Sequence, residues 1–267
     1  MKSNEMDKLR AQIDQTDEQI VELIRKRTRL TEEIGEQKKK DGLPIYRSDR
    51  HTSVYHKVAR GVNDPLLKKA IQSIYREIMS LGMAVEGDLK IYSCGGNAAY
   101  HAARLAFGTS IEIEPCEMPM MFDRVAKNMN SFGFVPATGE GSDKTLLAIL
   151  ENSLSVYAEA YSDSAFGKPD RYFILSQCTV EPTGGDCTCV ATVPLQGTTP
   201  DNLERCVSET GATLFSNRIL ETASAKYSIL DFSGHKDEPD AAMILESIKA
   251  RSSYIKILGS FPRAVSV

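Results

Sequence analysis

The chain has no hydrophobic run long enough to cross a membrane, and its first residues contain no apolar segment of the signal-peptide kind. It also has no strong net charge: the formal value is -4, which argues against nucleic acid as the main partner. These absences predict a cytoplasmic protein with no membrane and no nucleic acid among its partners. With 267 residues, the chain is long enough for two or three domains.

A disulfide framework is not expected either. The six cysteines are scattered through a chain that is large enough to build its own core, which predicts free thiols in a reducing compartment. Cys187 and Cys189, with His235 later in the sequence, could be metal ligands, but alternation along a strand is the favoured interpretation. We therefore predict no metal and no cofactor.

Glycine is absent from the first 34 residues, and the first proline is Pro44. Apolar residues recur there at helical spacing, which predicts one long helix over residues 6–40. At 1.5 Å per residue this helix would be about 50 Å long, too long to be buried against one compact neighbour, so we expect it to pack against a second copy. The apolar positions are Leu9, Ile13, Ile20, Leu23, Ile24, Leu30 and Ile34.

Cations interrupt the apolar stripe of this helix. Arg27 and Lys38 are eleven residues apart, about three turns, and therefore share one face. Arg10 lies about 25 Å before Arg27 and on another side, so only an antiparallel partner helix could bring the two together. The alternative is that these are solvated charges on a coiled-coil-like helix.

Two further helices are expected. Gly42 and Pro44 end the first helix, and a second is predicted over residues 49–60. Asp64 has the position of an N-cap before a third helix over residues 65–85. Three helices, one of them very long, do not close a core alone, whereas an intertwined dimer would.

The first ninety residues carry the patterns LRxxID, PxYRxxR and IYREIMS. They resemble the all-helical class of chorismate mutases, in particular the N-terminal module of bifunctional chorismate mutase–prephenate dehydratases. That class forms intertwined dimers in which the first helix of one subunit gives an arginine to the active site of the other. The resemblance implies conversion of chorismate to prephenate by a Claisen rearrangement, in aromatic amino acid biosynthesis.

The resemblance also implies roles for named residues. Arg10 matches the donated arginine, and Arg27 and Arg50 match the other arginines that bind the substrate carboxylates. Lys38 matches the lysine at the ether oxygen, and Glu86 stands where a Gln or Glu acts on the same oxygen. The chemistry suits these residues, because the rearrangement needs only a held conformer and donors aimed at the ether oxygen.

Two positions depart from the family pattern. His51 stands where the family has a glutamate that holds the substrate hydroxyl, and an imidazole can also donate or accept a hydrogen bond. Gly82 stands where a small polar residue is common. We keep His51 as a catalytic candidate and Gly82 as a substrate-binding candidate.

From residue 89 the pattern alternates strands and helices, which predicts a small parallel sheet. This part resembles the opening lobe of prephenate dehydratase. Residues 135–139 read VPATG where the family has VPIEN, and residues 170–172 read DRY where the family has the catalytic Thr-Arg-Phe. The segment between them is too short for a second lobe, so we expect dehydratase activity to be lost.

The remaining residues follow the order strand, helix, strand, strand, helix, strand, which is typical of a ferredoxin-like sandwich. The closing segment ILGSFPR resembles the end of the ACT domain of these dehydratases, where phenylalanine binds at a dimer interface. The resemblance implies an effector site, altered here, whose candidate residues are Gly197, Leu203, Asn217 and Arg218.

The expected architecture is therefore multi-domain. An all-α intertwined chorismate mutase domain spans residues 1–88, a truncated dehydratase-like α/β lobe spans 89–184, and an α+β ferredoxin-like ACT domain spans 185–267. The expected function is a chorismate mutase, an isomerase acting on the small molecule chorismate as a homodimer or tetramer. The alternatives are a bifunctional mutase–dehydratase and a weakly active regulatory protein that senses an aromatic amino acid.

Overall fold

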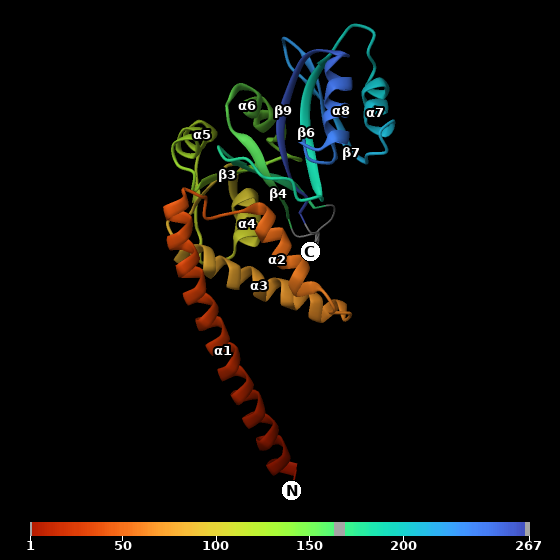
Figure 1. Ribbon diagram of the computed structural model, residues 1–267. Helices are drawn as coiled ribbons and strands as arrows, with labels where there is room; N and C mark the ends of the chain where they lie inside the picture. The colour runs from red at the N-terminus through yellow and green to blue at the C-terminus, as the bar shows by residue number, and fades with distance from the viewer. Residues whose placement is uncertain (1, 163–168, 265–267) are drawn as a thin grey trace.

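The protein is described by a computed structural model that covers residues 2–162 and 169–264. A rod-like helix extends from a body of two sheets and their covering helices (Figure 1). Within the described residues, no helix combines the length and the apolar character that a membrane span requires.

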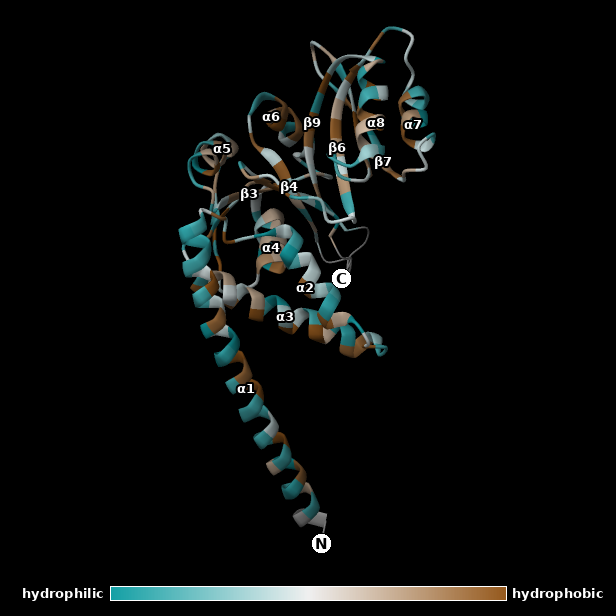
Figure 2. Ribbon diagram, viewed as in Figure 1, coloured by the Kyte–Doolittle hydropathy of each residue, from teal (hydrophilic) through white to brown (hydrophobic). Residues whose placement is uncertain are grey.

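The three predicted N-terminal helices are present as α1 (Lys2–Asp41), α2 (Ser48–Ala59) and α3 (Pro65–Glu86). The Asp64 side chain caps α3, since its Oδ1 accepts a hydrogen bond from the Leu66 amide at 2.9 Å. Only the C-terminal part of α1 reaches α3, and the rest stands alone with brown apolar positions among teal ones (Figure 2). The exposed apolar side chains of α1 are Met6, Leu9, Ile13, Ile20, Val21, Leu23, Leu30 and Ile34.

The first sheet has the strand order β2-β1-β3-β5-β4. The prediction of a parallel sheet is correct for β1, β2 and β3 only: β5 pairs antiparallel with β3 and with β4, so the sheet is mixed. Buried residues place α4 on one face and α5 and α6 on the other. The elements are β1 (Lys90–Ser93), α4 (Gly96–Phe107), β2 (Glu112–Pro115), α5 (Met118–Lys127), β3 (Ser131–Pro136), α6 (Ser142–Glu151), β4 (Ser155–Tyr161) and β5 (Arg171–Ser176).

The second sheet is antiparallel, with the strand order β7-β8-β6-β9. Its chain order is strand, helix, strand, strand, helix, strand, as predicted, and Cys187 and Cys189 lie on its strand β6. One face carries α7 and α8, and the other packs on α5, α6 and the first sheet in one shared core. The elements are β6 (Asp186–Pro194), α7 (Pro200–Ser208), β7 (Leu214–Glu221), β8 (Lys226–Ser233), α8 (Pro239–Lys249) and β9 (Ser252–Pro262).

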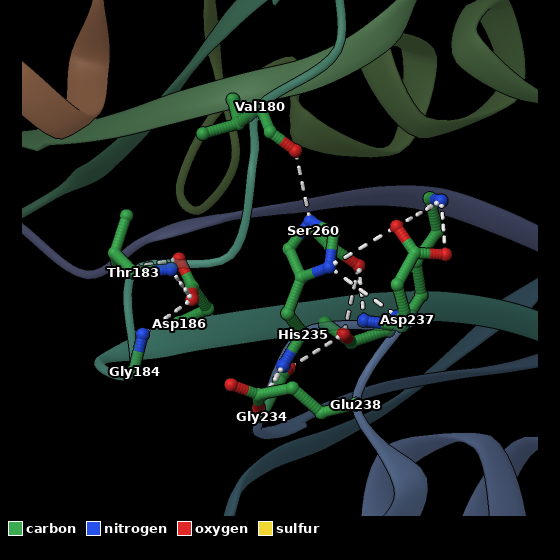
Figure 3. Close-up of polar contacts among 11 residues, drawn as sticks. Val180, Thr183, Gly184, Asp186, Gly234, His235, Asp237, Glu238 and Ser260 are labelled. Atoms are coloured by element: carbon green, nitrogen blue, oxygen red, sulfur yellow. Dashed lines mark hydrogen bonds and ion pairs between the residues drawn. The ribbon is translucent and has the colours of Figure 1, made fainter.

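Polar contacts also join the two sheets. Lys256 of β9 donates to the carbonyl oxygens of Ile149, Leu150 and Asn152 at 2.7 to 2.9 Å and so caps the C-terminal end of α6. The buried His235 lies with its Nε2 3.0 Å from the carbonyl oxygen of Val180, in the segment that connects the sheets (Figure 3). The second sheet is thus tied to the first by both apolar and polar contacts.

Candidate active site on the helical region

The last turns of α1 and α3 bring Lys38 and Glu86 together. The Lys38 Nζ donates to Glu86 Oε2 and to the carbonyl oxygen of Ile45, each at 2.6 Å. The Lys38 side chain is 17% exposed and that of Glu86 10%, so the pair is largely shielded from water. Charge-assisted hydrogen bonds of this kind fix an ammonium group firmly in place.

Gly35 permits this close approach. A β-carbon at position 35 would lie 2.6 Å from the Cα of Glu86, so any side chain there would push the two helices apart. No role at the site was predicted for Gly35 from the sequence. The available signal was a lone glycine inside a long helical pattern, where glycine is about 1 kcal/mol less favourable than alanine.

Arg27 lies near this pair and is half-buried. Its Nη1 donates to the carbonyl oxygen of Ile78 at 3.2 Å, and a β-carbon at Gly82 would lie 3.2 Å from the same nitrogen. Burial lowers the pKa of Arg27; Tyr75 opposes this shift, and the charge of Arg50 adds to it. Arg27, Arg50 and Gly82 therefore share one neighbourhood, together with Tyr75, for which no role in the site was predicted from the sequence.

Arg10 lies elsewhere in this chain. Its side chain is exposed on the projecting part of α1 and forms an ion pair with Asp7 at 3.5 Å. As the helical spacing implied, it does not reach Arg27 of its own chain.

His51 belongs to an aromatic cluster. Its ring packs edge-on against Tyr46 and Tyr55, with centroid distances of 5.5 and 5.1 Å. Burial lowers the pKa of His51 to about 4, so the imidazole is neutral at physiological pH. Tyr46 in turn packs against Phe107 and Phe132, so this cluster continues into the core of the first sheet.

Residues 9–87 match the family model described as chorismate mutase type II. The matched residues include most of α1 and all of α2 and α3. A T-protein of Enterobacter agglomerans is 36% identical over 78 residues, which are 27% of this chain and 21% of that protein. We call α1, α2 and α3 the mutase helices below.

The similarity to curated proteins extends beyond the mutase helices. A bifunctional chorismate mutase/prephenate dehydratase of Aquifex aeolicus (strain VF5) is 30% identical over 164 residues, which are 58% of this chain and 44% of that protein. One from Stutzerimonas stutzeri is 29% identical over 168 residues, which are 59% and 46% of the two chains. The chain therefore spans less than half the length of these bifunctional relatives.

Solved structures share the fold. A prephenate dehydratase from Arthrobacter aurescens in complex with L-Phe has a TM-score of 0.54 at 16% identity, with 67% of this chain and 93% of that chain covered. A protein described as a novel type of quorum quenching acylase has a TM-score of 0.56 at 20% identity, with 67% and 97% covered. At these identities the likeness describes the fold alone.

The segment that resembles the dehydratase motif lies at the start of β5 and contributes to the core. Arg171 Nε donates to Glu159 Oε2 at 2.7 Å, and its Nη1 forms an ion pair with Asp231 of β8. Although burial opposes the shift, these two carboxylates raise the pKa of Arg171. Tyr172 stacks on Phe134 with ring centroids 5.0 Å apart. In this chain Arg171 ties the first sheet to the second, and Tyr172 packs within the first sheet.

The effector candidates are spread over the second sheet. Leu203 is fully buried in the core beneath α7, and Gly197 lies in the turn before that helix. On β7, Asn217 Nδ2 donates to Glu204 of α7 at 2.8 Å. Arg218 Nη1 instead donates, at 2.9 Å, to the carbonyl oxygen of Ala137, which directly follows β3 of the first sheet. Neighbouring residues of a strand point to opposite faces. Asn217 and Arg218 therefore do not face one small ligand within this chain.

Proposed function

We propose that this protein is a chorismate mutase that converts chorismate to prephenate in aromatic amino acid biosynthesis. The observation that carries the proposal is the shielded Lys38–Glu86 pair beside Arg27, on helices that match the chorismate mutase type II family. Within the described residues, neither Arg27 nor Arg50 forms an ion pair, so both guanidinium groups are available for carboxylates.

The residues fit the chemistry of the rearrangement. In this reaction the ether C–O bond breaks while a new C–C bond forms within the same molecule, so the enzyme needs no nucleophile. Arg27 and Arg50 suit the two carboxylates of the substrate, because a guanidinium binds a carboxylate through paired hydrogen bonds. Lys38, already oriented, would donate to the ether oxygen as negative charge develops there. Glu86 would have to carry a proton to donate to the same oxygen.

The site in this proposal is completed by a second copy of the chain. The exposed apolar side chains along α1 favour a partner helix, and burying them would stabilise a dimer. An antiparallel partner would bring its own Arg10 toward Arg27. We propose that the functional unit is this intertwined homodimer in the cytoplasm.

The two sheets have a different role in the proposal. Asp170 occupies the position of the dehydratase threonine, and Arg171 is engaged by two carboxylates of the core. We therefore propose that dehydratase activity is lost. The second sheet is proposed to be an ACT domain, and binding of an aromatic amino acid to it would need residues of a partner subunit.

The test is turnover by the purified full chain, supplied separately with chorismate and with prephenate. We expect chorismate to give prephenate, and prephenate to remain unconverted. Unchanged chorismate would overturn the mutase proposal. Phenylpyruvate from prephenate would instead support a bifunctional enzyme. A kcat/KM far below about 10⁴ M⁻¹ s⁻¹ would support a regulatory protein, since ordinary enzymes lie above that value.

A further inference from the structure

The loop between α1 and α2, residues 42–47, is built into the core of the first sheet. Ile45 is 6% exposed and Tyr46 4% exposed, and both pack in the core that contains Phe107 and Phe132. A loop of the mutase helices is thus held by side chains of the α/β lobe, where a surface loop would be free to move.

Polar contacts hold the backbone of this loop from both sides. The amide of Ile45 donates to Asn130 Oδ1 at 2.8 Å, and the Tyr157 hydroxyl donates to the carbonyl oxygen of Tyr46 at 3.1 Å. Between these two contacts, the carbonyl oxygen of Ile45 accepts from Lys38 Nζ at 2.6 Å. A continuous series of hydrogen bonds therefore leads from Asn130, through Ile45, to Lys38.

Asn130 is itself held in place. It lies between α5 and β3, its amide donates to Asn128 Oδ1 at 2.9 Å, and its carbonyl oxygen accepts from the amide of Lys90 at the start of β1 at 3.1 Å. Because its backbone is fixed at both ends, its side chain offers a preorganised acceptor to the loop.

We propose that Asn130 is a positioning residue for Lys38, so that the α/β lobe forms part of the mutase site. This inference rests on the proposed mutase function. Lys38 has three donors, of which one is taken by Glu86 and one by Ile45. The Ile45 carbonyl therefore sets the direction of the donor that remains for the substrate. Without Asn130, the Ile45 carbonyl can rotate away from Lys38. Only Glu86 then orients the Lys38 ammonium group.

The test compares two substitutions of Asn130 in the full chain with chorismate as the substrate. Asn130→Ala removes the acceptor, and we expect kcat to fall about tenfold or more, because a small misplacement of a catalytic group is costly. KM should change little, since Arg27 and Arg50 bind the carboxylates in both the ground state and the transition state. Asn130→Asp keeps an acceptor oxygen, and we expect it to restore kcat to within about threefold.

The matched control is Asn152→Ala. The Asn152 side chain also forms a hydrogen bond with the backbone, in this case as the donor to the carbonyl oxygen of Ala148, but it lies at the far end of α6. Its kcat should equal that of the parent. An unchanged kcat in Asn130→Ala, or an equal loss in Asn130→Asp, would overturn the positioning role. If the parent itself fails to convert chorismate, the proposed function is wrong whatever Asn130 does.

A second variant covers the case in which Asn130→Ala does not fold. Tyr157→Phe removes only the hydroxyl that holds the other side of the loop and keeps the buried ring. We expect a lower kcat with an unchanged KM and a thermal midpoint close to that of the parent. A fully active Tyr157→Phe protein would then contradict the proposal that the α/β lobe positions Lys38 through this loop.

Discussion

The mutase helices and the two sheets differ in how they use their cations. In the sheets, Arg171 pairs with Glu159 and Asp231, and Arg218 pairs with Asp143. In the mutase helices, Lys38 pairs with Glu86, whereas Arg27 and Arg50 lie near each other and, within the described residues, form no ion pair. A cation with an internal partner stabilises the fold, whereas cations gathered in excess of carboxylates favour an anionic ligand. This contrast is why a mutase function is proposed for one region and a structural role for the other.

The largest effect is expected from Lys38→Gln. Because this lysine is the donor proposed at the ether oxygen, kcat should fall about a thousandfold. Loss of one preorganised hydrogen-bond donor has an effect of this size in other enzymes. The control is Lys39→Gln on the exposed side of the same turn, which should leave turnover unchanged. If the two variants converted chorismate equally fast, Lys38 would have no special role. The proposed difference in function between the mutase helices and the sheets would then fail. Chorismate turnover and the thermal midpoint should be measured for both.

In the sheets, Arg171→Met should affect stability. It leaves Asp231 buried without its cation and leaves Glu159 with Arg263 alone, at 3.6 Å, and losing one partner of a buried ion pair costs about 3–5 kcal/mol. Urea unfolding followed by circular dichroism would measure this loss. Lys226→Met, which breaks the exposed pair with Glu221, should leave the unfolding midpoint unchanged. A stable Arg171→Met protein would show that this arginine is not structural.

The dimer proposal is tested by complementation. Arg10→Ala should lower kcat/KM by about a hundredfold, because one carboxylate partner is lost. Mixing Arg10→Ala with Arg27→Ala subunits, unfolded and refolded together, should restore about a quarter of the parent activity, since half of the dimers then contain one intact site. No recovery in mixtures that form dimers would exclude an arginine donated between subunits.

The smallest effect concerns His51 and acid. Its pKa is about 4 in the folded protein against 6.5 as a model value, so the unfolded chain binds the proton first. Above pH 6.5 His51 is neutral in both the folded and the unfolded protein, so it does not lower the free energy of unfolding. As the pH is lowered toward 4, the free energy of unfolding falls by about 2 kcal/mol. Urea unfolding at pH 7 and pH 4.5 should give this difference for the parent and a smaller one for His51→Phe. The exposed His56→Gln should behave as the parent does.

Local sequence patterns determined much of the fold. The glycine-free apolar repeat predicted α1, Asp64 with Pro65 predicted the start of α3, and alternation predicted the strand that carries Cys187 and Cys189. These features depend on residues a few positions apart, so a pattern along the chain is enough to predict them. The mixed character of the first sheet was not predictable in this way, because it depends on which distant strand β5 joins.

For the candidate site, the sequence alone placed Arg27 and Lys38 on one face of a helix and kept Arg10 apart from them. Only the tertiary structure decided that Gly35 lets Glu86 reach Lys38, and that Asn130 holds the loop beside them. The partners in these two hydrogen bonds are 48 and 85 residues apart in the chain. Helical periodicity carries information over a few turns, whereas contacts at such separations depend on how the elements pack.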